Sequence, residues 1–324
     1  MTRSSGSRDG EPTGGAVLEK RIALWGAPES GRTTFVAMVP EAAEERSRGL
    51  GHGGTGRDHP PRWKVFGTDD ATQRFLRHTD HALLSEHRFP GEPGGSVDTA
   101  EPTRYRFLFR RDPRLVPLHR FTDHFRFAAT ITELPDPSTR RDEVKRALAD
   151  CTGLIVLFDP TDASGAGEDA VRALDRMLTE AAADLQPRTD PRGRLPFEPA
   201  VCVTKIDDMT LYREARLGAW AELDRDGRVR VRDPRAYFRR LCERDGPCPY
   251  PAAAELPGIL ERHFGRIRYY ATSAAGFRRS AGRIDPESCR NVDPHGNRLD
   301  GPPHPQGVLE PILGMRAVRI AKGG

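Results

Sequence analysis

Short apolar runs alternate with longer stretches of helical periodicity along most of this chain. Uninterrupted apolar runs are typical of buried strands, and apolar residues at helical spacing indicate helices that pack on a sheet. The predicted strands cover residues 21–25, 62–66, 105–110, 125–131, 153–158, 200–203 and 267–271. The predicted helices cover residues 33–39, 69–85, 142–150, 170–185, 234–242, 256–264 and 308–317.

Strands that alternate with helices favour an α/β fold, with a mainly parallel sheet and helices on both faces. We expect one domain over residues 20–275, because no internal repeat or sharp boundary divides it. Residues 1–19 are expected to form a disordered tail, and residues 276–324 a Gly/Pro-rich loop and a helix that packs on the same domain. The insertions expected within the domain are residues 44–61, 186–198 and 209–266.

The composition fits a globular protein of nearly balanced charge. Of the 324 residues 36% are hydrophobic, and 51 basic and 47 acidic residues give a formal net charge of +4. This charge provides no argument for binding to nucleic acid or to a membrane. The five cysteines lack zinc-site spacing, and no apolar stretch reaches the roughly 18 residues of a membrane span. We therefore expect a cytoplasmic protein that binds neither nucleic acid nor a membrane.

The segment between the first predicted strand and the first predicted helix carries candidate chemistry. Its sequence, GAPESGRTT, matches the phosphate-binding pattern GxxxxGK[ST], except that Arg32 stands in the lysine position. Glycines let backbone N–H groups turn toward a phosphate, a helix N-terminus lies behind them, and a hydroxyl can bind Mg²⁺. The alternative is an ordinary strand-to-helix turn that contains glycine. The candidate nucleotide-binding residues here are Gly26, Ala27, Pro28, Glu29, Ser30, Gly31, Arg32, Thr33 and Thr34.

Two later motifs are candidates for the recognition of a guanine base. Thr204, Lys205 and Asp207 lie in the sequence TKID, which follows a predicted strand. A carboxylate accepts hydrogen bonds from the ring N1–H and the exocyclic amine of guanine, a donor pair that adenine lacks. Ser273 and Ala274 follow the last predicted strand of the core, where a backbone N–H can donate to the guanine O6. Each motif alone is typical of a turn, but their order along the chain favours a guanine-nucleotide site.

In this order GAPESGRTT, ITELPD, GLIVLFD, TKID and TSA resemble the motifs of the Ras-like GTPase superfamily, over residues 20–275. The segment WKVFGTDDATQRF and the loop ahead of TRYRF look like the bacterial double-GTPase families. The resemblance implies a three-layer P-loop NTPase fold, GTP or GDP and Mg²⁺ as cofactors, and a nucleotide-dependent switch. It identifies the chain as a candidate GTP-binding protein.

The same resemblance assigns roles to single residues. Arg32 would be the cation on the phosphates, and Thr33 the hydroxyl on Mg²⁺. Thr99 is the expected threonine of the first switch, also on Mg²⁺, with Thr103 as the alternative. Lys205 and Asp207 would bind the base. Since the chain has only five lysines, Arg32 is interpreted as a lysine that was replaced in an arginine-rich sequence, although its guanidinium is broader than an ammonium.

The second switch departs from the family pattern Asp-x-x-Gly. Glu133 stands in the place of the Asp, one methylene longer and still able to reach a metal-bound water, and Asp136 stands in the place of the Gly. Pro137 stands where a glutamine that orients water is common, and proline has neither an N–H nor a polar side chain. We therefore expect slow or impaired hydrolysis, with Arg32, Glu133 and Thr99 as the candidate catalytic residues.

The expected partner is an unknown protein effector that contacts the two switch loops, residues 90–103 and 133–142. Two other functions stay open: a pseudo-GTPase scaffold with weak or no nucleotide binding, and a P-loop ATPase, against which the TKID motif argues. Asp159 is interpreted as a structural loop or cap residue, and Arg140–Arg141 as a solvated charge pair.

Overall fold

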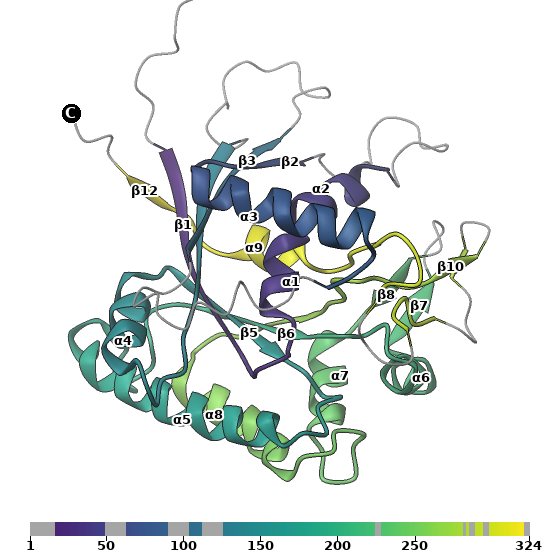
Figure 1. Cartoon of the computed structure of the whole chain (residues 1–324). Helices are drawn as coiled ribbons and strands as arrows, with labels where there is room; N and C mark the ends of the chain where they lie inside the picture. The colour runs from purple at the N-terminus through teal and green to yellow at the C-terminus, as the bar shows by residue number, and fades with distance from the viewer. Residues whose placement is uncertain are drawn as a thin grey trace, which may run out of the picture.

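A mainly parallel β-sheet forms the centre of the molecule (Figure 1). The computed structural model describes residues 17–48, 63–89, 104–111, 126–223, 228–280, 283–284, 289–293 and 298–320. Within these residues, eight strands pair in the order β2-β3-β4-β1-β5-β6-β9, with β12 beside β1. Strands β1, β4, β5, β6 and β9 are parallel, whereas β2, β3 and β12 pair antiparallel. The bounds are β1 (Val17–Gly26), β2 (Trp63–Gly67), β3 (Arg104–Arg111), β4 (Arg126–Glu133), β5 (Gly153–Phe158), β6 (Pro199–Val203), β9 (Arg268–Ala271) and β12 (Val318–Ile320).

Helices cover both faces of this sheet (Figure 1). One face carries α1 (Arg32–Ala37), α2 (Val39–Arg48), α3 (Asp70–Asp80) and α9 (Leu309–Gly314). The other face carries α4 (Arg141–Asp150), α5 (Ala166–Asp184), α6 (Met209–Leu217), α7 (Pro234–Leu241) and α8 (Leu256–His263). This arrangement confirms the fold class predicted from the sequence, a three-layer α/β structure with a mostly parallel sheet.

Several short elements complete the described chain. They are a π-helical turn (His81–Ser85), two 3-10 turns (Gln186–Arg188 and Pro251–Glu255) and two small hairpins, β7 (Ala221–Leu223) with β8 (Val229–Val231) and β10 (Arg279–Ser280) with β11 (Arg283–Ile284).

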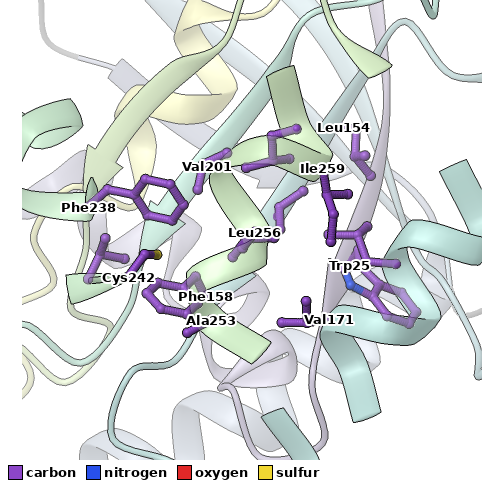
Figure 2. Packing of buried hydrophobic residues seen from close by; sticks show 14 of the residues in the cluster. Trp25, Leu154, Phe158, Val171, Val201, Phe238, Cys242, Ala253, Leu256 and Ile259 are labelled. Carbon is purple, nitrogen blue, oxygen red and sulfur yellow. The ribbon is translucent and has the colours of Figure 1, made fainter. Parts of the chain in front are cut away.

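The central strands are buried on both sides, which explains their uninterrupted apolar sequences. In β1, Ile22 and Leu24 enter the core beneath α1 and α2, while Ala23 and Trp25 enter the core beneath α4, α5 and α8. Figure 2 shows this second core, in which Trp25 and other strand residues meet side chains from α5, α7 and α8. Successive side chains of a strand point to opposite faces, so one short run supplies both cores.

The structure differs from the predicted elements at several places. Strand β1 begins at Val17, so residues 17–19 belong to the sheet and not to the predicted disordered tail. The first helix breaks at Met38 and resumes as α2, because Pro40 has no N–H to donate to the carbonyl of Val36. The prediction of a loop over residues 44–61 was wrong at its start, because helix α2 continues to Arg48. The predicted helix 308–317 ends at Gly314 and is followed by β12, whose pairing with β1 the local sequence did not indicate. Helix α6 and the small hairpins were not predicted either.

Lys20 is a buried charge that connects β1 to α9. Its Nζ donates to the carbonyls of Ile312, at 3.0 Å, and of Leu313, at 2.9 Å, and lies 4.2 Å from the centre of the Phe127 ring. Burial, and then the positive charge of Arg268, lower the pKa of Lys20 to about 8. The ammonium satisfies the last carbonyls of α9, but its desolvation opposes folding at neutral pH.

The stability of the protein should therefore rise with pH relative to a Lys20→Met variant. The folded state binds fewer protons than the unfolded state between the lowered pKa, about 8, and the ordinary lysine pKa of 10.5, so the free energy of unfolding increases through that window. Between pH 7.5 and 9.5 we expect a relative gain of about 2 kcal/mol, measured by urea unfolding. The matched change at an exposed lysine, Lys64→Met, should leave the pH dependence unchanged. A constant difference between the parent and Lys20→Met would contradict this prediction.

Candidate functional site

The candidate residues gather at one edge of the sheet. Because β1, β4, β5, β6 and β9 run parallel, their carboxyl ends lie at the same edge, with Leu24 opposite Glu133 and Gly26 opposite Leu157. Strand β1 lies between β4 and β5, so the chain crosses to opposite sides of β1. In open α/β sheets ligands bind in the crevice at such a point, outside the carboxyl ends of the strands.

The loop after β1 is folded tightly back on the strand end. A Cβ on Gly26 would lie 2.4 Å from Ser30 Oγ and 3.1 Å from Leu157 Cβ, so no other residue fits without a shift. Gly31 has φ of 88°, and Glu29, which is exposed, has φ of 61°. Two left-handed residues near the end of the loop turn its backbone into a compact curve.

The N-terminus of α1 presents unsatisfied donors to this loop. The first helical bond runs from the Phe35 N–H to the Gly31 carbonyl at 2.7 Å, and the Gly31 cap offers no side chain. Within the described chain, the N–H groups from Gly31 to Thr34 have no hydrogen-bond acceptor. Ser30 Oγ is buried and also without a partner. Free N–H groups at the positive end of a helix favour an anion.

Arg32 connects this loop to the second switch. Its Nη1 donates to the Leu134 carbonyl at 2.9 Å, directly after β4. The neighbouring Glu133 has a pKa raised by burial, which the positive charge of Arg32 opposes. The side chains of Glu133 and Tyr105 lie near enough to affect the pKa of each other, and burial raises the pKa of both. The Arg32 guanidinium therefore lies against the second switch in this structure.

The oxygen atoms near the loop fit a hard cation. Glu133 Oε1 is a buried acceptor without a partner, and Thr33 lies half-buried in the first turn of α1. Mg²⁺ beside phosphates takes only one or two protein oxygens and completes its shell with water and phosphate. A cluster of three or more His, Cys, Asp or Glu side chains that could hold a metal ion does not occur among the described residues.

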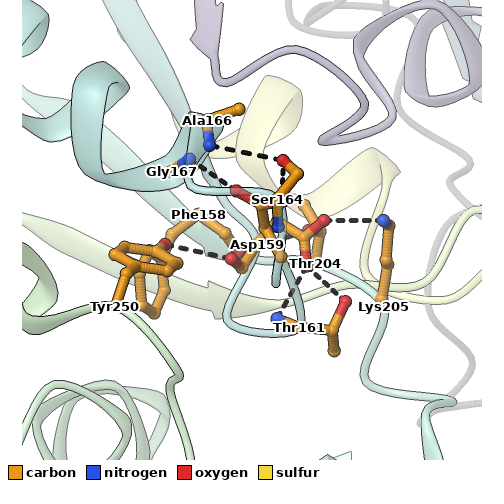
Figure 3. A network of polar contacts seen from close by, with 10 residues as sticks. Phe158, Asp159, Thr161, Ser164, Ala166, Gly167, Thr204, Lys205 and Tyr250 are labelled. Atoms are coloured by element: carbon orange, nitrogen blue, oxygen red, sulfur yellow. Dashed lines mark hydrogen bonds and ion pairs between the residues drawn. The ribbon is translucent and has the colours of Figure 1, made fainter.

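Lys205 and Asp159 form an ion pair at the ends of β6 and β5 (Figure 3). Lys205 has φ of 56°, and its Nζ lies 2.6 Å from Asp159 Oδ2. Asp159 Oδ1 accepts from the N–H and the hydroxyl of Thr161, and the Tyr250 hydroxyl donates to the Asp159 carbonyl at 3.0 Å. The structural interpretation of Asp159 fits these contacts. The pair holds the Lys205 side chain across the ends of the two strands.

The segments predicted to recognise a base lie next to each other. The Ile206 N–H donates to the Thr272 carbonyl at 3.3 Å, which joins the TKID loop to the loop after β9. Asp207 is buried, and burial raises its pKa to about 6, while the Ser273 hydroxyl opposes that rise. The Ala274 N–H has no acceptor within the described chain, whereas the Ser273 N–H donates to the Gln306 carbonyl at 2.9 Å. Ala274, rather than Ser273, offers a free donor here.

A distant part of the chain borders this region, and sequence reasoning missed it. Gln306 exchanges two backbone hydrogen bonds with Ser273, and the Cys289 thiol lies 3.4 Å from the Asp207 carbonyl. Both Gln306 side-chain polar atoms are buried without a partner. Residues 276–306 carry no local pattern that indicates this pairing, because it joins positions more than thirty residues apart in the chain.

The second switch begins with an ordered turn. Asp136 is exposed, its Oδ1 accepts from the Ser138 N–H at 2.8 Å, and its carbonyl accepts from the Arg140 N–H at 3.0 Å. Arg141 pairs with Glu180 of α5 at 2.7 Å. Asp136 thus shapes the turn that leads into α4.

Thr99 and Thr103, and the whole loop 90–103, lie outside the described residues. The role of Thr99 on Mg²⁺ and in catalysis therefore stays a prediction, as do the roles of the other predicted site residues.

Comparisons with known proteins do not assign this chain to a family. The sequence matches no protein-family model and no curated protein. Among solved structures it is similar to the crystal structure of sup35 complexed with GDP, with a TM-score of 0.31 and 12% identity over 84% of this chain and 41% of that chain. The chain spans less than half of that protein, and a likeness this low carries no argument about ligand or activity. No helix in the described part of the chain combines the length and apolarity needed to cross a membrane.

Proposed function

We propose that this chain is a Ras-like guanine-nucleotide-binding protein with slow or impaired GTP hydrolysis, which regulates a protein partner. The observation that carries the proposal is the loop Gly26–Thr34, with its free N–H groups and the buried, unpartnered Ser30 Oγ. It lies at the same sheet edge as Glu133 and the two loops predicted to bind a base. One phosphate site and one base site at a single crevice suit a nucleotide.

The proposed roles follow from these positions. The N–H groups of the loop hold the phosphates, and Arg32 exchanges the Leu134 carbonyl for a phosphate oxygen. Thr33, Glu133 (through water) and Thr99 would hold Mg²⁺, which neutralises phosphate charge when bound. On the base side, Asp207 would accept from guanine and the Ala274 N–H would donate to its O6, with the Lys205 stem along the ring.

The proposed partner contacts follow from the Arg32–Leu134 hydrogen bond. If a phosphate draws Arg32 away, the segment 133–142 loses a contact that holds it in its present place. Its exposed residues include Asp136, Ser138 and Thr139. An effector that binds this segment and the loop 90–103 would then distinguish two nucleotide states. The proposal includes neither nucleic acid nor a membrane as partner.

A pseudo-GTPase scaffold is the second candidate, and three observations favour it. Arg32 is bound to a backbone carbonyl, Asp207 is buried, and the Ser273 N–H is already paired with Gln306. A scaffold with weak or no nucleotide binding does not need these groups to be free for a ligand. The two functions differ in one measurable property, which is nucleotide affinity.

Nucleotide titration of Arg32 variants separates these functions. We expect Arg32→Lys to keep or improve the affinity for GDP and GTP in the presence of Mg²⁺, because an ammonium also neutralises phosphate. Arg32→Ala should weaken binding by about tenfold or more, since a charge-assisted contact is lost. The control is Arg192→Ala, at an exposed arginine in the loop before β6. Equal binding by all four proteins, or by none, would leave the loop without a phosphate role and support the scaffold.

A further inference from the structure

One face of the sheet is uncovered at the end formed by β2, β3 and β4. Along β3, Tyr105, Phe107 and Phe109 enter the core on the side of α2 and α3. The residues between them point to the opposite face, where the core beneath α4 to α8 includes no residue of these three strands. Within the described chain, no helix covers this part of the sheet. We call it the open sheet face.

Three cations stand side by side across the open sheet face. Lys64 of β2 is directly opposite Arg110 of β3, which is in turn directly opposite Arg126 of β4. All three are exposed, and none makes an ion pair within the described residues. Like charges directly opposite each other destabilise a pair of strands. The fold therefore gains nothing from this row of cations.

An apolar row separates these cations from a second basic group. Phe66, Leu108 and Ala128 pair across the same three strands, and Phe66 is 50% exposed. Beyond this row lie Arg106 on the open sheet face and, on the neighbouring strand β1, Arg21, which is directly opposite Thr130 of β4. The face therefore presents cations, then apolar side chains, then cations along the strand direction.

The second basic group lines a groove of about 270 Å³, together with the acidic side chains of Glu19 and Asp150. Arg106 and Arg21 are partly neutralised, by Asp69 at 3.7 Å and Asp150 at 2.5 Å. Arg104, which also lines the groove, is exposed and has no ion pair in the described part of the chain. The groove also includes Thr132, the residue before Glu133, so the open sheet face reaches the second switch.

We propose that the open sheet face docks an acidic protein segment that carries an aliphatic side chain between two acidic ones. The cation row and Arg106 are four residues apart on β3, about 13 Å, with Leu108 midway. In an extended peptide the residues i, i+2 and i+4 share one face at the same spacing. A segment of the type acid-x-aliphatic-x-acid therefore matches both the charges and the apolar row.

Charge argues against a second copy of the chain, and the small number of exposed aromatic side chains argues against a nucleic acid. A second copy of the chain would bring its own cation row against this one. A single-stranded nucleic acid is bound by several stacked aromatic side chains, whereas Phe66 is the aromatic side chain that this face exposes within the described residues. The inference is independent of nucleotide binding, because none of its residues belongs to the nucleotide site.

The test measures binding of a fluorescein-labelled peptide with the sequence Glu-Ser-Leu-Ser-Glu to the full chain at low ionic strength. The parent protein should bind it about tenfold more tightly than peptides in which Gln replaces Glu or Ser replaces Leu. The triple variant Lys64→Glu, Arg110→Glu, Arg126→Glu should lose binding. The matched control, Arg192→Glu, Arg216→Glu, Arg244→Glu, changes the net charge equally at exposed sites elsewhere and should retain it.

A single substitution separates loss of binding from loss of folding. Arg110→Glu converts two like-charged cross-strand pairs into two opposite-charged pairs, so it should raise Tm by about 2 °C while it weakens peptide binding. Several results would overturn the proposal: no peptide binding by the parent, an equal loss in the control triple variant, or tighter binding of a single-stranded RNA oligonucleotide or of anionic phosphatidylserine vesicles than of the acidic peptide.

Discussion

The Asp207→Asn variant should be more stable than the parent at pH 7 without ligand, and its preference for guanine nucleotides should be narrower. Burial raises the pKa of Asp207 from 3.8 to about 6, so the folded state binds more protons than the unfolded state between these values. Stability therefore falls as pH rises through that window, and at pH 7 the buried charge costs about 3 kcal/mol. Asn has nearly the same shape and no charge, which removes this cost.

The same substitution tests base recognition. In the parent, we expect GTP and GDP to bind at least about tenfold more tightly than adenine nucleotides, which corresponds to about 1.4 kcal/mol. Asp207→Asn should narrow that difference, because the amide presents a donor to a donor edge of guanine. The measurements are urea unfolding at pH 4 and pH 7 and nucleotide titration. At pH 4 the stabilisation should nearly vanish, because Asp207 is then protonated in the folded state.

Asp208→Asn is the matched control for Asp207. Asp208 caps α6 by accepting from the N–H groups of Thr210 and Leu211, and Asn caps a helix almost equally well. We expect a change in stability of about 0.5 kcal/mol or less. Equal affinities of the parent for ATP and GTP would contradict the proposed role of Asp207 in base recognition. Unchanged stability of the Asp207→Asn variant at pH 7 would show that the buried charge of Asp207 does not destabilise the folded protein.

Intrinsic GTP hydrolysis should be very slow, at or below about 10⁻⁴ per second, the scale of an unassisted small GTPase. The double change Asp136→Gly with Pro137→Gln should speed it about tenfold or more, because it removes a negative charge from a site that accumulates negative charge and adds a side chain that can orient water. The affinity for GDP should change little, since GDP lacks the γ-phosphate. Single-turnover phosphate release from GTP measures the rate.

Asp136→Asn separates charge from turn geometry. The amide oxygen of Asn can still accept from the Ser138 N–H, as Asp136 Oδ1 does at 2.8 Å, while the charge is lost. A faster rate in this variant assigns the inhibition to charge, and an unchanged rate assigns it to the missing glutamine. Fast hydrolysis by the parent without a partner would show that another group acts, and Arg140 and Glu133 would be examined first.

The sequence determined seven strands of the central sheet, most of the helices and the order of the candidate motifs. The run Gly153–Phe158 is entirely buried, and its lack of polar residues identifies a central strand without any knowledge of its neighbours. The loop Gly26–Thr34 is contiguous, so its spacing, its glycines and the helix after it are visible in the sequence. Periodicity and turn chemistry are local properties, which is why both were predicted correctly.

Only the tertiary structure decided which distant residues meet. The Arg32 hydrogen bond to Leu134, the pairing of Gln306 with Ser273 and the strand β12 beside β1 each join segments far apart in the chain. The row of Lys64, Arg110 and Arg126 likewise depends on strand order and register. Order and register result from how all the apolar faces pack together, and no short segment encodes that choice.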